Sequence, residues 1–335
     1  MFSHVTEGAM SGTIPESVWV TFQMTFIIIS PAIIVGAFAE RMKFSAMLIF
    51  TVLWTILSYL PMWHMVWHSD TGLFHGGEAG NWLMGAGEHA IDFAGGNVVH
   101  INAGIAGLVA CFMVGKRKGF PGPTLVPHNV PFVLIGAALL WVGWFGFNAG
   151  SAGAANGSAG MAMLTTQIAT AAALVVWMAL EWIISKKPTA VGVATGAVAG
   201  LVAITPAAGS TDVAGALAIG AISSLVCYFA ATKLKHTFNY DDSLDVFGVH
   251  GMGGIVGALL TGVFIREGYG TEGGGLQFWI QAKSVIVTAL WSAVAAAIAL
   301  LIAKVLCKGL RVDEDVEHQG LDRNDHGEEA YSSES

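Results

Sequence analysis

Nine long apolar stretches limit the fold of this chain more than any other feature of its sequence. A helix that crosses a membrane needs about 20 mostly apolar residues, because lipid offers no hydrogen-bond partner to its backbone. Only 11% of the residues are charged, against roughly 25% in a soluble domain. The sequence therefore predicts an all-α, polytopic membrane helix bundle. The nine predicted spans are Val18–Phe38, Ala46–Val66, Val98–Val114, Pro131–Phe147, Met161–Ile184, Ala190–Pro206, Val213–Ala231, Val246–Phe264 and Val285–Val305.

The basic residues predict the orientation of these spans, because lysine and arginine stay on the cytoplasmic side of a membrane. Most of them follow the first, third, fifth, seventh and ninth spans, whereas the other side keeps only Arg266 and Lys283. This alternation supports nine spans independently of hydropathy. It predicts a multi-pass protein of the cell (inner) membrane with its amino terminus outside and its carboxyl terminus in the cytoplasm. The basic residues on the predicted cytoplasmic side are Arg41, Lys43, Lys116, Arg117, Lys118, Lys186, Lys187, Lys233, Lys235, Lys304, Lys308, Arg311 and Arg323.

Two segments of the chain resemble each other: DFAGGNVVHINAGIAGLV, which begins at Asp92, and DVFGVHGMGGIVGAL, which begins at Asp245. When they are aligned on His100 and His250, both have glycine at +4 and +7, isoleucine at +5 and an aspartate upstream. The segments belong to the third and eighth spans, which cross the membrane in opposite directions. This pattern is typical of an inverted-topology repeat, whose substrate site lies near the midplane between the halves.

His100 and His250 are candidate pore residues, because ionisable groups in apolar helices are costly and usually face a bundle interior or a water-filled path. Their equivalent repeat positions predict a facing pair, and two imidazoles that share one hydrogen bond remain neutral most easily. Two alternatives stay open. The histidines could be separate, each bonded to a backbone carbonyl, or they could bind a metal, although zinc would need at least one further ligand.

Asp92 and Asp245 lie where the third and eighth spans begin. Aspartate is favoured at helix N-caps, which is one interpretation of both residues. A second interpretation applies to Asp92, whose negative charge would attract a cation to an external entrance.

Aromatic residues gather in spans whose ends are predicted to face outward. An interfacial aromatic belt explains any single one of them. Together they could bind a small cation on their ring faces, which is worth about 0.5–2 kcal/mol per contact. Ser151 could add a hydrogen-bond acceptor. The aromatic residues are Phe22, Phe26, Trp63, Trp67, Trp144 and Phe147.

Several runs resemble signatures of the Amt/Mep/Rh ammonium transporter family, and Trp67 and Ser151 place the chain near its bacterial Amt branch. The runs are DFAGGNVVHINAGIAGLVACFMVGKR (Asp92–Arg117), GAFAER (Gly36–Arg41), GWFGFNAGSAG (Gly143–Gly153) and DVFGVHG (Asp245–Gly251).

The resemblance implies a role for each candidate residue. Trp67, Phe26 and Ser151 match a site that captures ammonium, with Phe22 nearby and Asp92 supporting it. Phe26 and Phe147 match a stacked phenyl gate, and His100, His250 and Trp144 match the pore lining. The implied function is ammonium capture outside, deprotonation near the gate and passage of ammonia past the histidines. The resemblance also implies that the protein is a homotrimer, that it is not an enzyme and that it has no cofactor.

The resemblance also divides the chain into a transmembrane channel domain (1–308) and a cytoplasmic regulatory tail (309–335). From Val312 to Ser335 the tail holds nine acidic residues and one base, Arg323. The tail resembles tails that dock the PII signalling protein. A disordered acidic tail is the alternative. Family members normally have eleven spans, so we expect the first two helices to be lacking here. The acidic residues are Asp313, Glu314, Asp315, Glu317, Asp322, Asp325, Glu328, Glu329 and Glu334.

Three other functions remain open at this point. One is an ammonium sensor of the same fold, which a long extra cytoplasmic domain would favour. Another is an intramembrane metalloenzyme that uses the histidines and aspartates. A third is a pore for another small neutral solute, such as water or carbon dioxide.

Overall fold

The structure is a computed structural model that describes residues 5–122, 126–268 and 274–331. Within these ranges it contains eight helical stretches long and apolar enough to cross a membrane, and a ninth, shorter apolar helix. Each of the nine overlaps one of the predicted spans, and two of the spans need correction. Several include π-helical turns, labelled η. The elements are β1 (Met10–Ser11), β2 (Ile14–Pro15), α1 (Glu16–Phe38), α2 (Phe44–Trp54), η1 (Thr55–Tyr59), α3 (Leu60–Trp67), η2 (Gly96–Ile101), α4 (Asn102–Val114), α5 (Val130–Gly150), α6 (Gly157–Ser185), α7 (Ala190–Ile204), α8 (Val213–Phe229), η3 (Ala230–Leu234), α9 (Lys235–Thr237), η4 (Phe247–Gly251), α10 (Met252–Phe264), α11 (Gly274–Leu306), α12 (Glu314–Gln319) and η5 (Asp322–His326).

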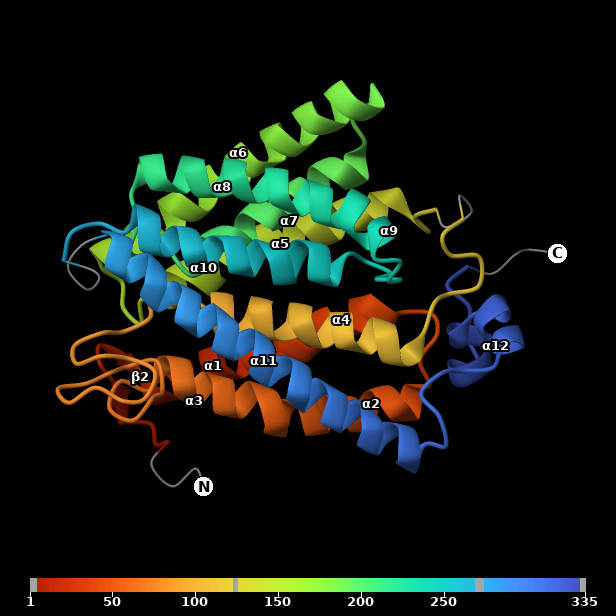
Figure 1. Ribbon diagram of the computed structural model, residues 1–335, viewed down its shortest axis with the longest axis horizontal. Coiled ribbons are helices and arrows are strands. Elements are labelled where there is room, and N and C mark those ends of the chain that lie inside the picture. Colours follow the sequence, from red (N-terminus) through yellow and green to blue (C-terminus); the bar gives the residue numbers. More distant parts are fainter. Residues whose placement is uncertain (1–4, 123–125, 269–273, 332–335) are drawn as a thin grey trace.

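The helices form two groups that run along the long axis of the molecule (Figure 1). One group contains α1 to α4, the other contains α5 to α10, and α11 crosses them while contacting α2, α4 and α10. The short β1–β2 hairpin and helix α12 lie at opposite ends of the molecule (Figure 1). This placement is what an odd number of crossings requires.

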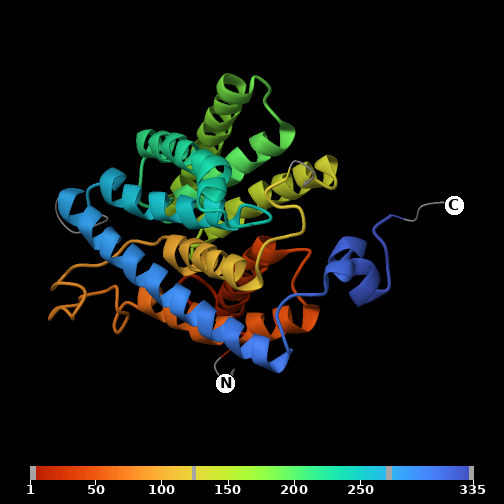
Figure 2. The same ribbon diagram turned by 45° about the vertical axis from the view of Figure 1, so that its right-hand side comes forward.

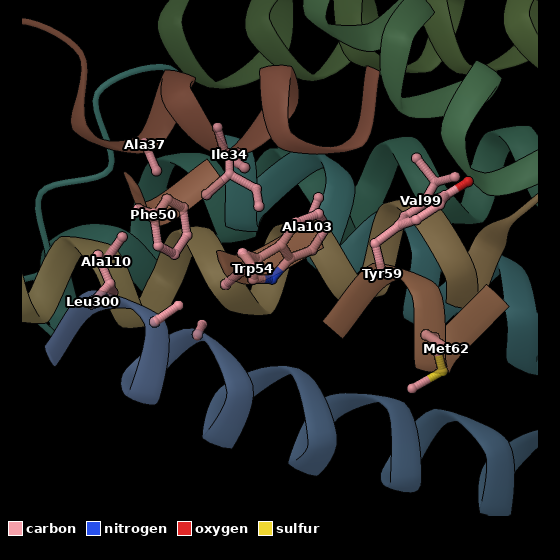
Figure 3. Packing of buried hydrophobic residues seen from close by; sticks show 14 of the residues in the cluster. Ile34, Ala37, Phe50, Trp54, Tyr59, Met62, Val99, Ala103, Ala110 and Leu300 are labelled. Carbon is pink, nitrogen blue, oxygen red and sulfur yellow. The ribbon is translucent and has the colours of Figure 1, made fainter. Parts of the chain in front are cut away.

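A buried apolar cluster joins α1, α2, α4 and α11 (Figure 3). Trp54, Phe50 and Ile34 are each at most 1% exposed, and they pack against alanines of α4. Such small residues let neighbouring backbones approach closely, which favours helix association in lipid. The cluster fixes α4, which directly follows the turn η2 that carries His100, one of the two candidate histidines.

The sixth predicted span needs correction, because α7 has only 15 residues. At 1.5 Å per residue it is about 22 Å long, less than the roughly 30 Å of a bilayer core. The chain continues as a buried turn from Thr205 to Ser210, where the Pro206 carbonyl accepts a 3.0 Å hydrogen bond from the Phe93 amide. Irregular backbone is tolerated at membrane depth when protein surrounds it, as it does here.

The ninth predicted span was also wrong at its start, since α11 begins at Gly274 rather than at Val285. Its first turns contain polar residues that a hydropathy criterion rejects. Two of them, Gln277 and Gln281, are fully buried. Gln281 exchanges hydrogen bonds of 2.7 and 2.8 Å with the backbone of Ile91, so the loop before η2 satisfies this part of the helix. Lys283 consequently lies inside α11, where it forms a 2.7 Å ion pair with Glu88.

The described part of the tail forms hydrogen bonds with loops between the helices, and α12 lies beyond the end of the bundle (Figure 2). The Val312 amide donates to the Arg41 carbonyl at 3.1 Å, and the Lys43 amide donates to the Leu310 carbonyl at 2.8 Å. Glu317 accepts hydrogen bonds from Arg311 and from the Lys118 amide. This part of the tail is therefore ordered by contacts with the transmembrane part. Glu334, one of the nine tail acids, lies outside the described residues.

Candidate functional site

The two histidines of the internal repeat meet inside the helix bundle. His100 lies in η2 and His250 in η4, the π-helical turns that begin the two repeat-related helices. Their Nδ1 atoms are 3.2 Å apart and their ring centroids 5.3 Å apart. One Nδ1 must therefore carry the hydrogen and the other the lone pair, as in a pair of neutral imidazoles. The structure thus brings together the two rings that the repeat predicted to face each other.

Glycines at equivalent repeat positions allow this meeting. A side chain on Gly104 would overlap the backbone of Gly251, next to His250. A Cβ on Gly254 would lie 2.9 Å from the Ile101 side chain and 3.1 Å from the His100 Cβ. The two helices consequently cross at backbone contact, which is the geometry that small residues permit in membranes. Both glycines are the +4 residues of the repeat.

Asp92 caps the first of these helices and is almost fully buried. Its two carboxylate oxygens accept hydrogen bonds from four consecutive amides, including those of Gly95 at 3.0 Å and Asn97 at 2.8 Å. Both oxygens are thus occupied by the backbone. This favours the N-cap interpretation and assigns Asp92 an indirect part in any cation site.

The prediction that Asp245 is the counterpart of Asp92 is wrong. Asp242 occupies the equivalent position, because each aspartate precedes its histidine by eight residues. Asp242 accepts a 2.7 Å hydrogen bond from the Phe247 amide, just as Asp92 accepts one from Asn97. Asp245 instead has a positive φ of 57° and pairs with Lys235 at 2.6 Å. The carboxylate of Asp245 is therefore engaged by a lysine of a neighbouring segment and does not cap the helix that follows it.

A continuous file of aromatic rings leads from the loop end of α3 to the histidines. Phe26 lies 5.6 Å from Trp67 and 4.4 Å from Phe147, measured between ring centroids. Phe147 stacks on Trp144 at 5.0 Å, and Trp144 stacks on His100 at 5.3 Å. Trp144 is only 2% exposed, so it lies deep in the helix bundle rather than at its outer rim. Two more rings, Trp19 and Phe22, extend the file at its outer end, where Phe22 is 4.9 Å from Phe26.

The remaining candidate residues have different neighbours. The Trp67 indole donates to the Asp92 carbonyl at 2.7 Å, which ties the aromatic file to the cap of η2. The Ser151 hydroxyl donates to the Phe147 carbonyl at 2.8 Å, one turn earlier in the chain. Trp63 donates to Gln23 at 3.1 Å and does not join the file. Trp63 therefore fits the interfacial interpretation better than the site.

Sequence reasoning missed two residues that position this site. Thr205 accepts a 2.9 Å hydrogen bond from the Trp144 indole and so orients a ring of the file. No pattern in the sequence marks Thr205, since the contact joins residues far apart in the chain. Asp242 could have been found, because its spacing from His250 equals that of Asp92 from His100.

A network of buried charges holds the opposite end of the molecule. The fully buried Arg41 donates to the Gly115 carbonyl at 2.8 Å and to Ser243 at 2.6 Å. Arg117 pairs with Asp241 at 2.7 Å. Burial alone would raise the pKa of Asp241, but the hydrogen bonds and charge of Arg117 outweigh it and hold that pKa below its ordinary value. This network joins the ends of α1 and α4 to the loop that contains Asp242.

The family model described as the Ammonium Transporter Family matches residues 2–331 of this sequence. The chain belongs to the Ammonium Transporter Family. An ammonium transporter of Aquifex aeolicus is 50% identical over 316 residues, which cover 93% of this chain and 70% of that protein.

Solved structures of the Ammonium Transporter Family have the same fold. Saccharomyces cerevisiae Mep2 matches with a TM-score of 0.80 and 31% identity over 90% of this chain and 68% of its own. A structure described as a Sensor Amt Protein matches with a TM-score of 0.77 and 32% identity, over 90% of this chain and 75% of its own. The all-α membrane fold predicted from the sequence is thereby confirmed, with the two corrected spans.

Proposed function

We propose that this chain transports ammonium by capturing the cation at Trp67 and Phe26, removing its proton near Phe147, and conducting ammonia past His100 and His250. The observation that carries the proposal is the unbroken file of rings between Trp67 and the histidine pair. The family membership of the chain supports ammonium as the substrate.

The physical argument begins with the cost of desolvation. A bare ammonium ion in an apolar passage has lost its hydration and is very unfavourable, whereas neutral ammonia has lost much less. Aromatic faces at the entrance recover part of that cost by cation–π attraction, about 0.5–2 kcal/mol for each ring. Trp67, Phe26 and Phe22 supply such faces at the outer end of the file. The chemistry therefore favours capture as a cation and passage as a neutral molecule.

The gate consists of Phe26 and Phe147. Their centroids are only 4.4 Å apart, so the direct route between the capture site and the histidines is closed. A hollow of about 590 Å³ between α1 and α5 borders these rings and is lined in part by Phe22, Thr25 and Phe147. Because the hollow is adjacent, the rings have room to rotate aside while ammonia passes.

The histidine pair suits a neutral passenger. Ammonia is both a donor and an acceptor of hydrogen bonds, and a neutral imidazole offers one group of each kind. His100 Nε2 is buried and has no hydrogen-bond partner among the described residues. A passing ammonia molecule would satisfy it.

Uptake of methylammonium into proteoliposomes tests the proposal. We expect the double change His100→Ala and His250→Ala to abolish uptake, while His89→Gln, on the loop before η2, leaves it unchanged. Both variants should be shown to elute at the same size as the parent protein. Undiminished uptake by the double variant would remove the histidines from the mechanism.

We propose in addition that the protein functions as a homotrimer in the cell (inner) membrane, with α12 on the cytoplasmic side and the PII signalling protein as a partner of residues 309–335. The ordered contacts of Val312 and Glu317 with cytoplasmic loops support a regulatory tail. A chain that ends at Lys308 should no longer retain PII on a column, whereas the full chain should. Retention by the shortened chain would contradict this role of the tail.

A sensor function is the second candidate, because a Sensor Amt Protein matches the fold as well. A sensor would bind ammonium without sustained uptake, so the uptake assay separates the two. The metalloenzyme alternative has less support, since the described ranges hold no cluster of three or more histidine, cysteine or acidic side chains that could bind a metal. The family membership of the chain favours transport over this alternative.

A further inference from the structure

We propose that His64 and His68 form a two-imidazole site for a divalent transition-metal ion, copper(II) above all, at the loop end of α3. His64 lies in the last turn of α3, and His68 is the residue that ends the helix. Residues four apart lie on one face of a helix, and these two rings stack with centroids 4.8 Å apart. Neither residue belongs to the aromatic file or to the histidine pair described above.

The ring nitrogens of these histidines converge on a single point. The Thr71 hydroxyl lies 3.2 Å from His64 Nε2 and 3.1 Å from His68 Nδ1. The Thr71 amide donates to the same His68 nitrogen at 3.2 Å, so that nitrogen carries a lone pair. A metal ion in place of the hydroxyl needs nitrogen distances of about 2.0 Å, which requires each ring to move by about 1 Å. Both histidines and Thr71 are exposed, so such a movement meets little resistance.

The surroundings of this point favour a cation. Asp70 follows His68 by two residues, and no lysine or arginine occurs between His68 and Ile91. Solvent can reach the site and supply water as the remaining ligands, which two protein ligands alone require. Imidazole suits copper, zinc and nickel, and copper(II) binds most tightly of the divalent first-row ions.

Two other histidine pairs in the described part of the chain lack these features. His100 and His250 are hydrogen-bonded to each other in the interior, where His100 is fully buried. His75 and His89 stack at 6.1 Å, but His75 Nε2 is engaged by the Val66 carbonyl at 2.7 Å. The rings of His64 and His68 are thus exposed, and their nitrogens point to one place. His89 serves as a matched control.

Copper titration of the purified full chain tests the site. The protein should carry an amino-terminal affinity tag without histidine and with an acetylated terminus, so that neither the tag nor the terminal amine binds metal. We expect one high-affinity copper(II) per chain, with nitrogen splitting from two imidazoles in the electron paramagnetic resonance spectrum. His64→Gln and His68→Gln should each weaken binding by at least about tenfold, because the second ligand contributes through its high effective concentration.

His89→Gln should leave copper binding at the level of the parent protein. The parent and the His89→Gln variant should also show a copper-dependent rise in thermal unfolding midpoint that the His64→Gln and His68→Gln variants lack, since a ligand of the folded state stabilises it. The proposal is overturned if only one of the two histidines matters, if His89→Gln weakens binding equally, or if the spectrum shows a single nitrogen. These measurements need no transport, so their outcome is independent of the proposed function.

Discussion

The two helices that carry the histidines begin alike, but their caps lie in different surroundings. Asp92 and Asp242 each precede a histidine by eight residues and each accept an amide hydrogen bond at the start of a π-helical turn. Four amides saturate Asp92, whereas one oxygen of Asp242 has no hydrogen-bond partner among the described residues. Asp242 also lies in a loop with Asp241 and Asp245, which pair with Arg117 and Lys235.

The comparison shows which feature the two halves of the repeat share and which feature differs between them. Both halves need a carboxylate that satisfies the first amides of the helix, since buried orphan donors are costly. Only the half that contains Asp242 places that carboxylate among other ionisable groups, namely Asp241 and Asp245 with their partners. We therefore expect the Asp92 side to depend mainly on hydrogen bonds and the Asp242 side to depend also on pH.

The largest expected effect concerns the crossing of the two helices. Gly104→Ala places a methyl group against the backbone of Gly251, which cannot move without shifting His250. We expect a loss of stability of about 3 kcal/mol, the upper end for overpacking. Gly254→Ala meets side-chain atoms of Ile101 and His100 at 2.9 and 3.1 Å, so its cost should be smaller. Thermal unfolding in detergent measures both, and equal losses would show that the crossing is not limited by the Gly104–Gly251 contact.

The second largest effect on stability is expected at the two capping aspartates, Asp92 and Asp242. Asp92→Ala removes the acceptor of four amides, and we expect it to destabilise the protein by about 2 kcal/mol. Asp242→Ala removes the acceptor of the Phe247 amide and should cost about 1 kcal/mol or less. Unfolding midpoints at neutral pH compare them, with Asp212→Ala, a cap of α8 outside the repeat, as the reference. A larger loss at Asp242 would reverse the comparison.

The two capping aspartates should also differ in how they make folding stability depend on pH. Burial, with a contribution from the charge of Asp245, raises the pKa of Asp242 from 3.8 to about 6. The folded state therefore holds a proton that the unfolded state releases, and folding stability falls as pH rises from about 4 to about 6. The loss should be about 1.4 kcal/mol for each pH unit within this window. The difference in unfolding midpoint between the parent and Asp242→Asn should shrink towards low pH, and a constant difference would contradict this prediction.

The smallest effect is expected at the ion pair that joins the long loop to α11. The hydrogen bond from Lys283, helped by the Gly85 amide, lowers the pKa of Glu88. Its contribution is therefore present above the ordinary glutamate pKa and is lost as pH falls through the lowered value. For a partly exposed pair we expect about 0.5 kcal/mol at neutral pH. Glu88→Gln should show this loss and Glu78→Gln, on the exposed part of the same loop, should not.

The sequence alone determined the features that depend on local composition. Apolar length located all nine helices, because the absence of water obliges each crossing to satisfy its own backbone. The repeat around His100 and His250 predicted that these residues meet, because equivalent positions in oppositely directed helices face the same axis.

Only the tertiary structure decided the features that depend on contacts between distant segments. α7 ends after 15 residues because other helices enclose the turn that follows it, and α11 begins early because the backbone of Ile91 satisfies Gln281. The pairing of Asp245 with Lys235 likewise depends on the path of the loop before η4. Hydropathy measures the preference of each isolated residue for lipid over water. A polar group that forms hydrogen bonds with a distant segment of the fold can be buried in spite of that preference.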